Sequence, residues 1–243
     1  MNCKFLSMFR MAIGLIALLA VNSTASAALP VALTGALPES AAVEKLVPSL
    51  PSMRDFAFSV INGSQDNLVG VYVEQVMALP VIQQPGGDAT FVSTQSDVVT
   101  EFRFARKRQS IGLLAHNYLA GDHFAQITPG ETITLVYGDG SLASYRVFEL
   151  QRYQALNPID PYSNFVDLAN PSTTLTSTEV FYRTYGVGNL LVLQTCIQQG
   201  SQDSWGRLFI LAEPVNEEQS LSLVQFIQWD LHALLTTEYT VAV

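Results

Sequence analysis

The sequence predicts an all-β fold, built as a barrel or a sandwich. Of its 243 residues, 49% are hydrophobic and only 14% are charged, which suffices for one well-packed core. From Leu68 onward, short β-type runs alternate with turn residues, and no long helical pattern separates them. The 15 glycines and 11 prolines are ordinary frequencies, so collagen-like and low-complexity classes are excluded.

Charge and cysteine content limit the partners further. The chain has 12 basic and 21 acidic residues, a net charge of −9. Such a balance gives no electrostatic footprint for nucleic acid or an anionic membrane surface, so we expect no nucleic-acid partner. Two cysteines exclude a disulfide scaffold and a zinc-finger cluster. We expect neither a metal nor another cofactor.

The amino terminus has the pattern of an export signal. Lys4 and Arg10 precede an uncharged apolar run, residues 11–21, and Ala25-Ser26-Ala27 matches a cleavage site. The run spans roughly half of a bilayer core, so a permanent membrane helix is the weaker interpretation. We expect residues 1–27 to be removed and the protein to be exported. Cys196 is then the one cysteine that remains. Three alternatives are open for it: it is buried and inert, it pairs with another chain, or it is reactive.

Residues 28–64, with four prolines among small residues, are predicted to be a linker or an amino-terminal extension. Residues 65–215 are predicted to form the β domain. Turn signals lie at Pro85-Gly86-Gly87 and Gly138-Asp139-Gly140. The predicted strands are 69–73, 81–82, 111–115, 133–137, 145–150, 190–193 and 208–212.

The carboxyl end, residues 216–243, follows a different pattern. Apolar residues recur at three-to-four spacing between Glu217 and Leu235, which predicts an amphipathic helix. We expect this helix to cover the core of the barrel or one of its open ends. Its polar face has Gln and Asp where a membrane-surface helix would have Lys or Arg.

A candidate reactive pair lies near the end of the domain. Cys196 ends an apolar strand, residues 197–206 are predicted to be a polar loop, and Arg207 opens the next apolar strand. If the two strands pair as a hairpin, the Cβ atoms of Cys196 and Arg207 lie roughly 5 Å apart. The guanidinium could then lower the thiol pKa or donate to a developing oxyanion. The alternative is an arginine that solvates a hairpin end beside a packed cysteine.

A nucleophilic thiol needs an acid/base partner, and the chain has three histidines. His116 ends an apolar strand, as Cys196 does, and is therefore the best candidate. A purely structural role for it stays open. His123 is expected in an exposed turn, and His232 on the terminal helix.

The ordered set of motifs between about Val69 and Val215 resembles the sortases, a family of exported cysteine transpeptidases. A strand ends in His116, a Pro-Gly-Glu turn follows, and the Gly138–Gly140 turn precedes Tyr145-Arg-Val147. The last two motifs are Val192-Leu-Gln-Thr-Cys196 and Arg207-Leu-Phe-Ile-Leu-Ala212. Departures from the family pattern are Val192 in place of Thr, Asn117 where many members have Arg, and a short amino-terminal apolar run.

The resemblance implies a sortase-like closed β-barrel, and we expect the protein to be a monomer. It makes Cys196 the nucleophile, His116 the general acid/base and Arg207 the residue that positions the substrate carbonyl and oxyanion. Thr195 would shape the acyl-binding pocket, and residues 158–185 would contribute to the choice of substrate. The substrate would be a peptide or protein with a sorting-type motif, cleaved through a thioester on Cys196 and transferred to an amine acceptor.

Two other functions stay open on the residues alone. One is a thiol hydrolase on the same scaffold, and the other is a non-catalytic exported β-barrel that binds a partner. A basic cluster, Arg103, Arg106, Lys107 and Arg108, precedes the histidine strand. We expect a solvated loop there, with a site for an acidic partner as the alternative.

Overall fold

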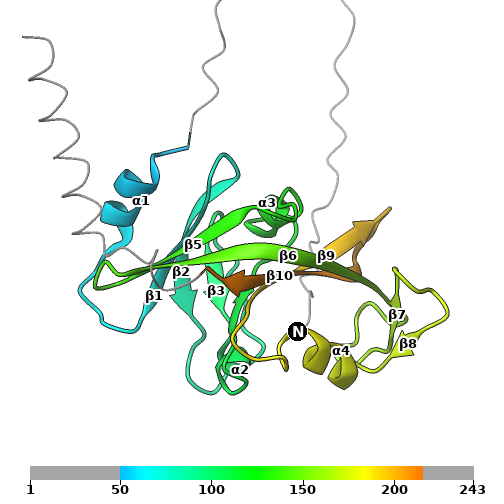
Figure 1. Ribbon diagram of the computed structural model, residues 1–243. Coiled ribbons are helices and arrows are strands. Elements are labelled where there is room, and N and C mark those ends of the chain that lie inside the picture. The colour runs from blue at the N-terminus through cyan, green and yellow to red at the C-terminus, as the bar shows by residue number, and fades with distance from the viewer. Residues whose placement is uncertain (1–49, 216–243) are drawn as a thin grey trace, which may run out of the picture. The chain divides into compact units, whose positions relative to one another are not determined.

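The computed structural model describes residues 50–215, and within them the fold is a closed β-barrel with short helices (Figure 1). The strands form one sheet in the order β10-β9-β4-β3-β2-β1-β5-β6-β7-β8. An additional pairing between β10 and β6 closes eight of these strands into a barrel, from which β7 and β8 extend. The elements are α1 (Met53–Val60), β1 (Leu68–Val73), β2 (Met77–Gln83), β3 (Val99–Glu101), α2 (Arg103–Arg106), β4 (Ile111–Leu114), α3 (Gly121–Phe124), β5 (Thr132–Tyr137), β6 (Leu142–Ala155), β7 (Phe165–Asp167), β8 (Thr174–Leu175), α4 (Ser177–Thr184), β9 (Leu191–Gln199) and β10 (Gln202–Pro214).

The barrel is mixed in strand direction. Most neighbours are antiparallel, whereas β2 pairs with β3 and β4 pairs with β9 in parallel. The predicted all-β class and closed barrel are confirmed. The predicted carboxyl-terminal helix lies outside the described residues, as does the predicted signal peptide.

Two apolar clusters sit on opposite faces of β9 and β10. Leu191, Leu193 and Ile210 belong to the cluster inside the barrel. Val192 and Phe209 belong to a second cluster, which also contains residues of α4. Because side chains alternate along a strand, odd positions of β9 face inward and even positions face outward, toward α2 and α4. The central strands are therefore buried on both faces, as their continuous apolar runs predict.

Helix α1 lies within the segment that the sequence suggests is a linker or extension. Ser52 caps its amino terminus by accepting a hydrogen bond from the amide of Asp55. Phe56 and Ala57 are buried against Val69 and Val136 of the sheet. The last part of the 28–64 segment thus packs on the barrel.

Helix α4 occupies the middle of the long polar stretch before β9. Thr176 and Glu179 form a capping box, in which each side chain accepts a hydrogen bond from the backbone amide of the other residue. Val180 and Thr184 of this helix are buried, and Tyr185, which follows it, packs against Phe209 of β10. The helix therefore covers the outward face of the strands that carry Cys196 and Arg207.

Candidate active site

The candidate residues lie on three neighbouring strands, β4, β9 and β10. The predicted hairpin register is confirmed, because Cys196 of β9 pairs directly with Arg207 of β10. On the other side of β9, the parallel register pairs Leu114 with Gln194, and the amide of Ala115 still donates to the carbonyl of Gln194. The chain of β4 thus approaches His116 on the flank of β9 that is opposite to Arg207.

The predicted polar loop between these strands is wrong. Strand β9 continues to Gln199 and β10 begins at Gln202, so that only Gly200 and Ser201 form the turn. Gly200 has a φ of 59°, a left-handed conformation that suits glycine in such a tight turn. The register shifts between Gln202 and Gly206, which marks a β-bulge beside the candidate arginine. Cys196 therefore lies within a strand, and not at the end of one.

Cys196 is buried, with 8% of its surface exposed. As an even position of β9 it shares the outward face with Val192, and not with the core inside the barrel. It also borders a cavity of about 310 Å³ that Thr195 and Arg152 help to line. A cysteine at the edge of a cavity differs from one packed only among aliphatic side chains, because solvent and ligands can approach it.

Arg207 is unusually buried for a charged residue, at 6% exposure. Its Nη1 atom donates to the carbonyl oxygens of Ser204, at 2.9 Å, and Gly206, at 2.8 Å. The guanidinium carbon lies 5.9 Å from the centre of the Phe165 ring. Both of these hydrogen bonds use one nitrogen, so Nε and Nη2 have no hydrogen-bond partner among the described residues. Those two donors can bind a carbonyl oxygen or an oxyanion.

His116 begins a tight turn after β4. Its carbonyl accepts hydrogen bonds from the amides of Leu119 and Gly121, and its ring stacks on Tyr118, with centroids 5.3 Å apart. The next residue, Asn117, donates from Nδ2 to the carbonyl of Asp203, at 3.1 Å. This hydrogen bond connects the turn that begins at His116 to the bulged hairpin of β9 and β10.

Thr195 points in the opposite direction from Cys196, as its odd position requires. A Cβ atom on Gly121, the first residue of α3, would collide with both Oγ1 of Thr195 and the carbonyl of His116. Oγ1 of Thr195 is buried and has no hydrogen-bond partner among the described residues. The start of helix α3 therefore packs closely between β9 and the turn that begins at His116, and only glycine fits at position 121.

A groove opens beside Arg207 on the outward face. Its volume is about 140 Å³, and it is lined mostly by aromatic and apolar side chains. Its lining residues are Phe102, Pro161, Phe165, Ser177, Val180, Phe181, Tyr185, Gln194, Arg207 and Phe209. Six of these residues fall within the segment 158–185. Arg207 borders this groove, whereas Cys196 borders the cavity of about 310 Å³. The two paired residues therefore lie between the groove and that cavity.

Sequence reasoning missed the residues that support this arrangement. Tyr118 stacks on His116, Phe165 lies beneath the guanidinium of Arg207, and Ser204 binds that guanidinium through its carbonyl. The hydroxyl of Ser204 also donates to the carbonyl of Pro158, at 3.0 Å. Tyr118, two residues after His116, and Ser204, three residues before Arg207, are close in sequence to the candidate residues, whereas Phe165 is not.

The remaining histidine of the domain, His123, lies on α3 and is partly buried. Its Nδ1 atom is 3.1 Å from the carbonyl of Val76. Between residues 50 and 215, no group of three or more His, Cys, Asp or Glu side chains could hold a metal ion. No helix in this part of the chain is long and apolar enough to cross a membrane.

Neither the protein-family models nor the curated proteins include a match to this chain. Solved structures do match. Sortase A of Listeria monocytogenes is 15% identical with a TM-score of 0.36, covering 63% of this chain and 94% of the other. Sortase C-1 of Actinomyces oris is 14% identical with a TM-score of 0.40, covering 71% and 85%. Sortase E1 of Streptomyces coelicolor, solved with a tripeptide in its active site, is 14% identical with a TM-score of 0.39, covering 61% and 88%.

The chain is structurally similar to sortases. These similarities concern the fold.

Proposed function

We propose that the protein is an exported cysteine transpeptidase or peptidase that forms a thioester with a peptide on Cys196. The observation that carries this proposal is the strand register. Cys196 and Arg207 are direct partners on the outward face of β9 and β10, and β4 leads to His116 on the other flank of Cys196. Acyl transfer needs a nucleophile, a hydrogen-bond donor for the oxyanion and an acid/base group, and adjacent strands carry or lead to one residue of each kind.

The first step makes the thioester. The thiolate of Cys196 attacks a backbone carbonyl carbon of the substrate, and the negative charge that forms on oxygen is stabilised by Nε and Nη2 of Arg207. The carbon–nitrogen bond then breaks, and protonated His116 gives its proton to the leaving amine. Thr195 lines the cavity beside Cys196 and would shape the wall of that cavity next to the acyl group.

The second step decides between joining and hydrolysis. An incoming amine attacks the thioester carbon, neutral His116 takes the proton of that amine, and the sulfur leaves as thiolate. If water attacks instead, the same residues make the protein a thiol hydrolase. The choice depends on how well the bound peptide and the cavity beside Cys196 exclude water.

The groove beside Arg207 is the proposed binding site for the substrate. An aromatic and apolar lining with one cation suits an extended peptide whose carbonyl is held by the guanidinium. Residues 158–185 supply most of this lining and are proposed to set the recognised motif. We propose that the protein acts outside the cytoplasm as a monomer on peptide or protein substrates with a sorting-type motif.

Alkylation of the thiol tests the reactive role of Cys196. In the native protein, Cys196 should react with iodoacetamide within minutes near neutral pH, and more slowly in His116→Ala and Arg207→Ala. The matched control is His123→Ala, which removes a histidine of the same domain that hydrogen-bonds Val76. Labelling only after unfolding, at one rate in all variants, would support the non-catalytic binding module instead.

Mass spectrometry tests the chemistry itself. The protein is incubated with a peptide library, with and without an added amine such as triglycine. A thioester adduct on Cys196, followed by amine-linked product, shows transpeptidation, whereas free carboxylate product with or without the amine shows hydrolysis. Absence of any adduct or product across the library contradicts both enzymatic readings.

A further inference from the structure

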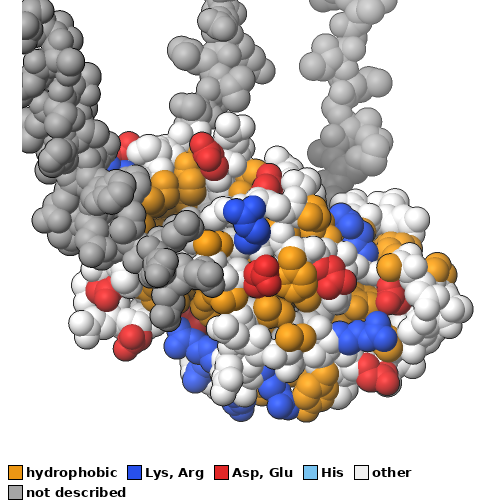
Figure 2. Space-filling model, viewed as in Figure 1, with side chains coloured by type: hydrophobic (Ala, Val, Ile, Leu, Met, Phe, Trp, Pro, Cys, Tyr) orange, Lys and Arg blue, Asp and Glu red, His pale blue; other side chains and the backbone are white. Residues whose placement is uncertain are grey.

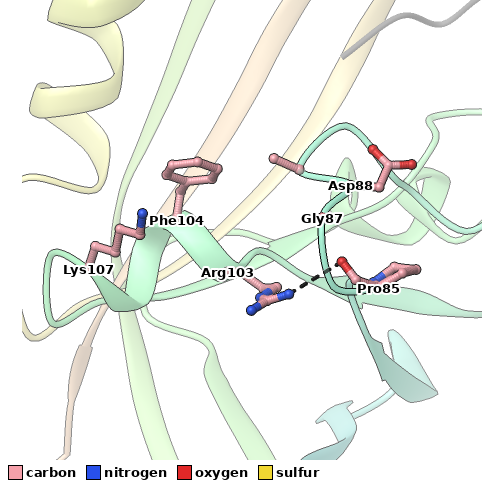
Figure 3. Close-up of a pocket in the computed structure, with 7 residues that line it drawn as sticks. Pro85, Gly87, Asp88, Arg103, Phe104 and Lys107 are labelled. Atoms are coloured by element: carbon pink, nitrogen blue, oxygen red, sulfur yellow. Dashed lines mark hydrogen bonds between the residues drawn. The ribbon is translucent and has the colours of Figure 1, made fainter.

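A third pocket lies apart from the candidate active site, between α2 and the loop that follows β2 (Figure 3). We call it the basic pocket. Its volume is about 240 Å³, and its lining residues are Pro85, Gly87, Asp88, Ala89, Arg103, Phe104 and Lys107. It shares no lining residue with the groove beside Arg207 or with the cavity beside Cys196. The proposed chemistry on Cys196 therefore does not account for it.

Four of the chain's 12 basic residues lie at positions 103–108, and two of them are already engaged. Arg106 forms an ion pair with buried Glu101. Arg108 donates to the hydroxyl of Tyr182 and stacks on that ring. Lysine and arginine side chains gather along the lower edge of the molecule in Figure 2, where Figure 1 places α2 and α4.

The other two basic residues line the pocket, and neither has a carboxylate partner among the described residues. Arg103 donates from Nη1 to the carbonyl of Pro85, at 3.3 Å. Nζ of Lys107 lies 4.5 Å from the centre of the Phe104 ring. Two positive charges thus line one hollow, and neither forms an ion pair with a described carboxylate.

Asp88, the acidic residue in the lining, forms hydrogen bonds with Thr90 and not with the two basic residues. Its Oδ1 atom accepts hydrogen bonds from the amide of Thr90, at 2.9 Å, and from its hydroxyl, at 2.7 Å. These bonds lower the pKa of Asp88. Figure 3 shows its carboxylate turned away from Arg103 and Lys107. Asp88 therefore stays ionised, and the lining carries two positive charges, Arg103 and Lys107, against this one negative charge.

The rest of the lining is apolar. Phe104 is 40% exposed, and Pro85 and Ala89 are the other apolar side chains in the lining. A ligand that fits both features carries an anionic group next to an apolar side chain. A small inorganic anion would leave the apolar part of the lining uncovered.

The position of the pocket favours a peptide. The rings of Phe104, on the pocket, and Phe102, on the groove beside Arg207, have centroids 6.0 Å apart. An extended chain covers that distance in about two residues. A peptide bound in the basic pocket can therefore continue toward the groove, although binding in the pocket does not depend on any reaction there.

We propose that the basic pocket binds an acidic stretch of a peptide, with a carboxylate held by Arg103 and Lys107 and a neighbouring apolar side chain against Phe104. The carboxylate replaces the missing acid partner of both cations. Gly87, which has no side chain, leaves open space on its side of the pocket. The ligand class is an acidic peptide with an apolar or aromatic residue next to its acidic residues.

Fluorescence anisotropy tests this proposal without any need for turnover. The probe is a labelled octapeptide with a phenylalanine followed by two glutamates in an alanine and serine background, and its partner has glutamine at both positions. The protein is the full chain with Cys196→Ala, so that thiol chemistry does not contribute. We expect the glutamate peptide to bind about tenfold more tightly at low salt, and this difference to shrink as salt is added.

Arg103→Gln and Lys107→Gln should each weaken binding of the glutamate peptide roughly two- to fivefold, and the double variant about tenfold. The matched control is Arg146→Gln, because Arg146 is an arginine elsewhere that also donates from Nη1 to a backbone carbonyl. Equal binding of the two peptides, or equal loss in the control, overturns the proposal. Displacement of the probe by inorganic phosphate or by anionic lipid vesicles, as effective as by the unlabelled peptide, also overturns it.

Discussion

Arg207 illustrates what burial does to a single charged side chain. At 6% exposure it has lost most of its water, and no ion pair with a described acid compensates for that loss. Two backbone carbonyls and the Phe165 ring supply the compensation. The same contacts fix the guanidinium in one orientation, which leaves Nε and Nη2 as oriented donors on the residue whose backbone pairs with Cys196.

We therefore predict that Arg207→Lys is not a conservative substitution. Lysine keeps the charge but lacks the planar set of donors, so acyl-enzyme formation should slow by about 100-fold or more. The measurement is the rate of adduct formation on Cys196 with a peptide that acylates the native protein. The control is Arg146→Lys, which should match the native rate. An unchanged rate in Arg207→Lys would exclude the oxyanion role.

Tyr137, at the end of β5, shows the effect of burial on an uncharged acid. Desolvation raises its pKa to about 12, and the nearby Tyr145 and Glu101 add to the rise. The folded state thus holds the phenolic proton more tightly than the unfolded chain, whose tyrosine has a pKa near 10. This contribution to stability is complete below pH 10 and is lost as the pH rises toward 12.

The prediction is a fall in the melting temperature between pH 10 and pH 12 that is smaller in Tyr137→Phe. Phenylalanine has no proton to lose, so the variant lacks this part of the pH dependence. The control is Tyr162→Phe, because Tyr162 is 82% exposed. The interpretation fails if both variants show the pH profile of the native protein.

At the scale of the element, α1 shows how a short helix gains its stability from packing. Eight residues are too few for a stable isolated helix in water. Phe56 lies against the sheet so closely that a Cβ atom on Gly70 would come within 2.9 Å of its ring. The glycine in β1 and the aromatic ring in α1 therefore fit each other.

Phe56→Ala should lower the free energy of unfolding by about 3–5 kcal/mol, because it empties a buried aromatic site. Phe58→Ala, in the same helix, should change it by less than about 0.5 kcal/mol, because Phe58 is 50% exposed. Urea denaturation of both variants gives the comparison. Similar midpoints for the two would mean that α1 does not pack as described.

At the scale of the whole molecule, closure of the barrel is what fixes the candidate site. Strand β10 pairs with β9 on one side and with β6 on the other, and the parallel pairing of β4 with β9 joins segments far apart in the chain. Ile210 lies at the seam, paired with Leu193 of β9 and Leu150 of β6, and is fully buried. Burial of this side chain therefore stabilises the pairing of β10 with β9 and its pairing with β6.

Ile210→Ala should cost about 2–5 kcal/mol and lower the unfolding midpoint of the whole barrel, because the seam and the core share this residue. Val187→Ala is the control, since Val187 is 68% exposed. Tyrosine fluorescence and far-ultraviolet circular dichroism should report the same midpoint. Two separate transitions would show that the barrel does not unfold as one unit.

Much of the strand pattern could be predicted from the sequence, and the failure at the β9–β10 hairpin has a clear cause. The apolar runs at 190–193 and 208–212 were recognised because both of their faces are buried. Gln198, Gln199 and Gln202 are exposed, so they have no apolar alternation to reveal a strand. Backbone pairing, which a sequence pattern does not show, extends β9 to Gln199 and starts β10 at Gln202.

The amino-acid sequence by itself determined the β class and the pairing of Cys196 with Arg207, because alternation and hairpin pairing act over short distances along the chain. Only the tertiary structure decided which flank of Cys196 the histidine turn approaches, what surrounds Arg207, and where α2 and the loop after β2 form the basic pocket. Those contacts join segments that are distant in sequence. They follow from the order of the strands and the closure of the sheet, which no local pattern encodes.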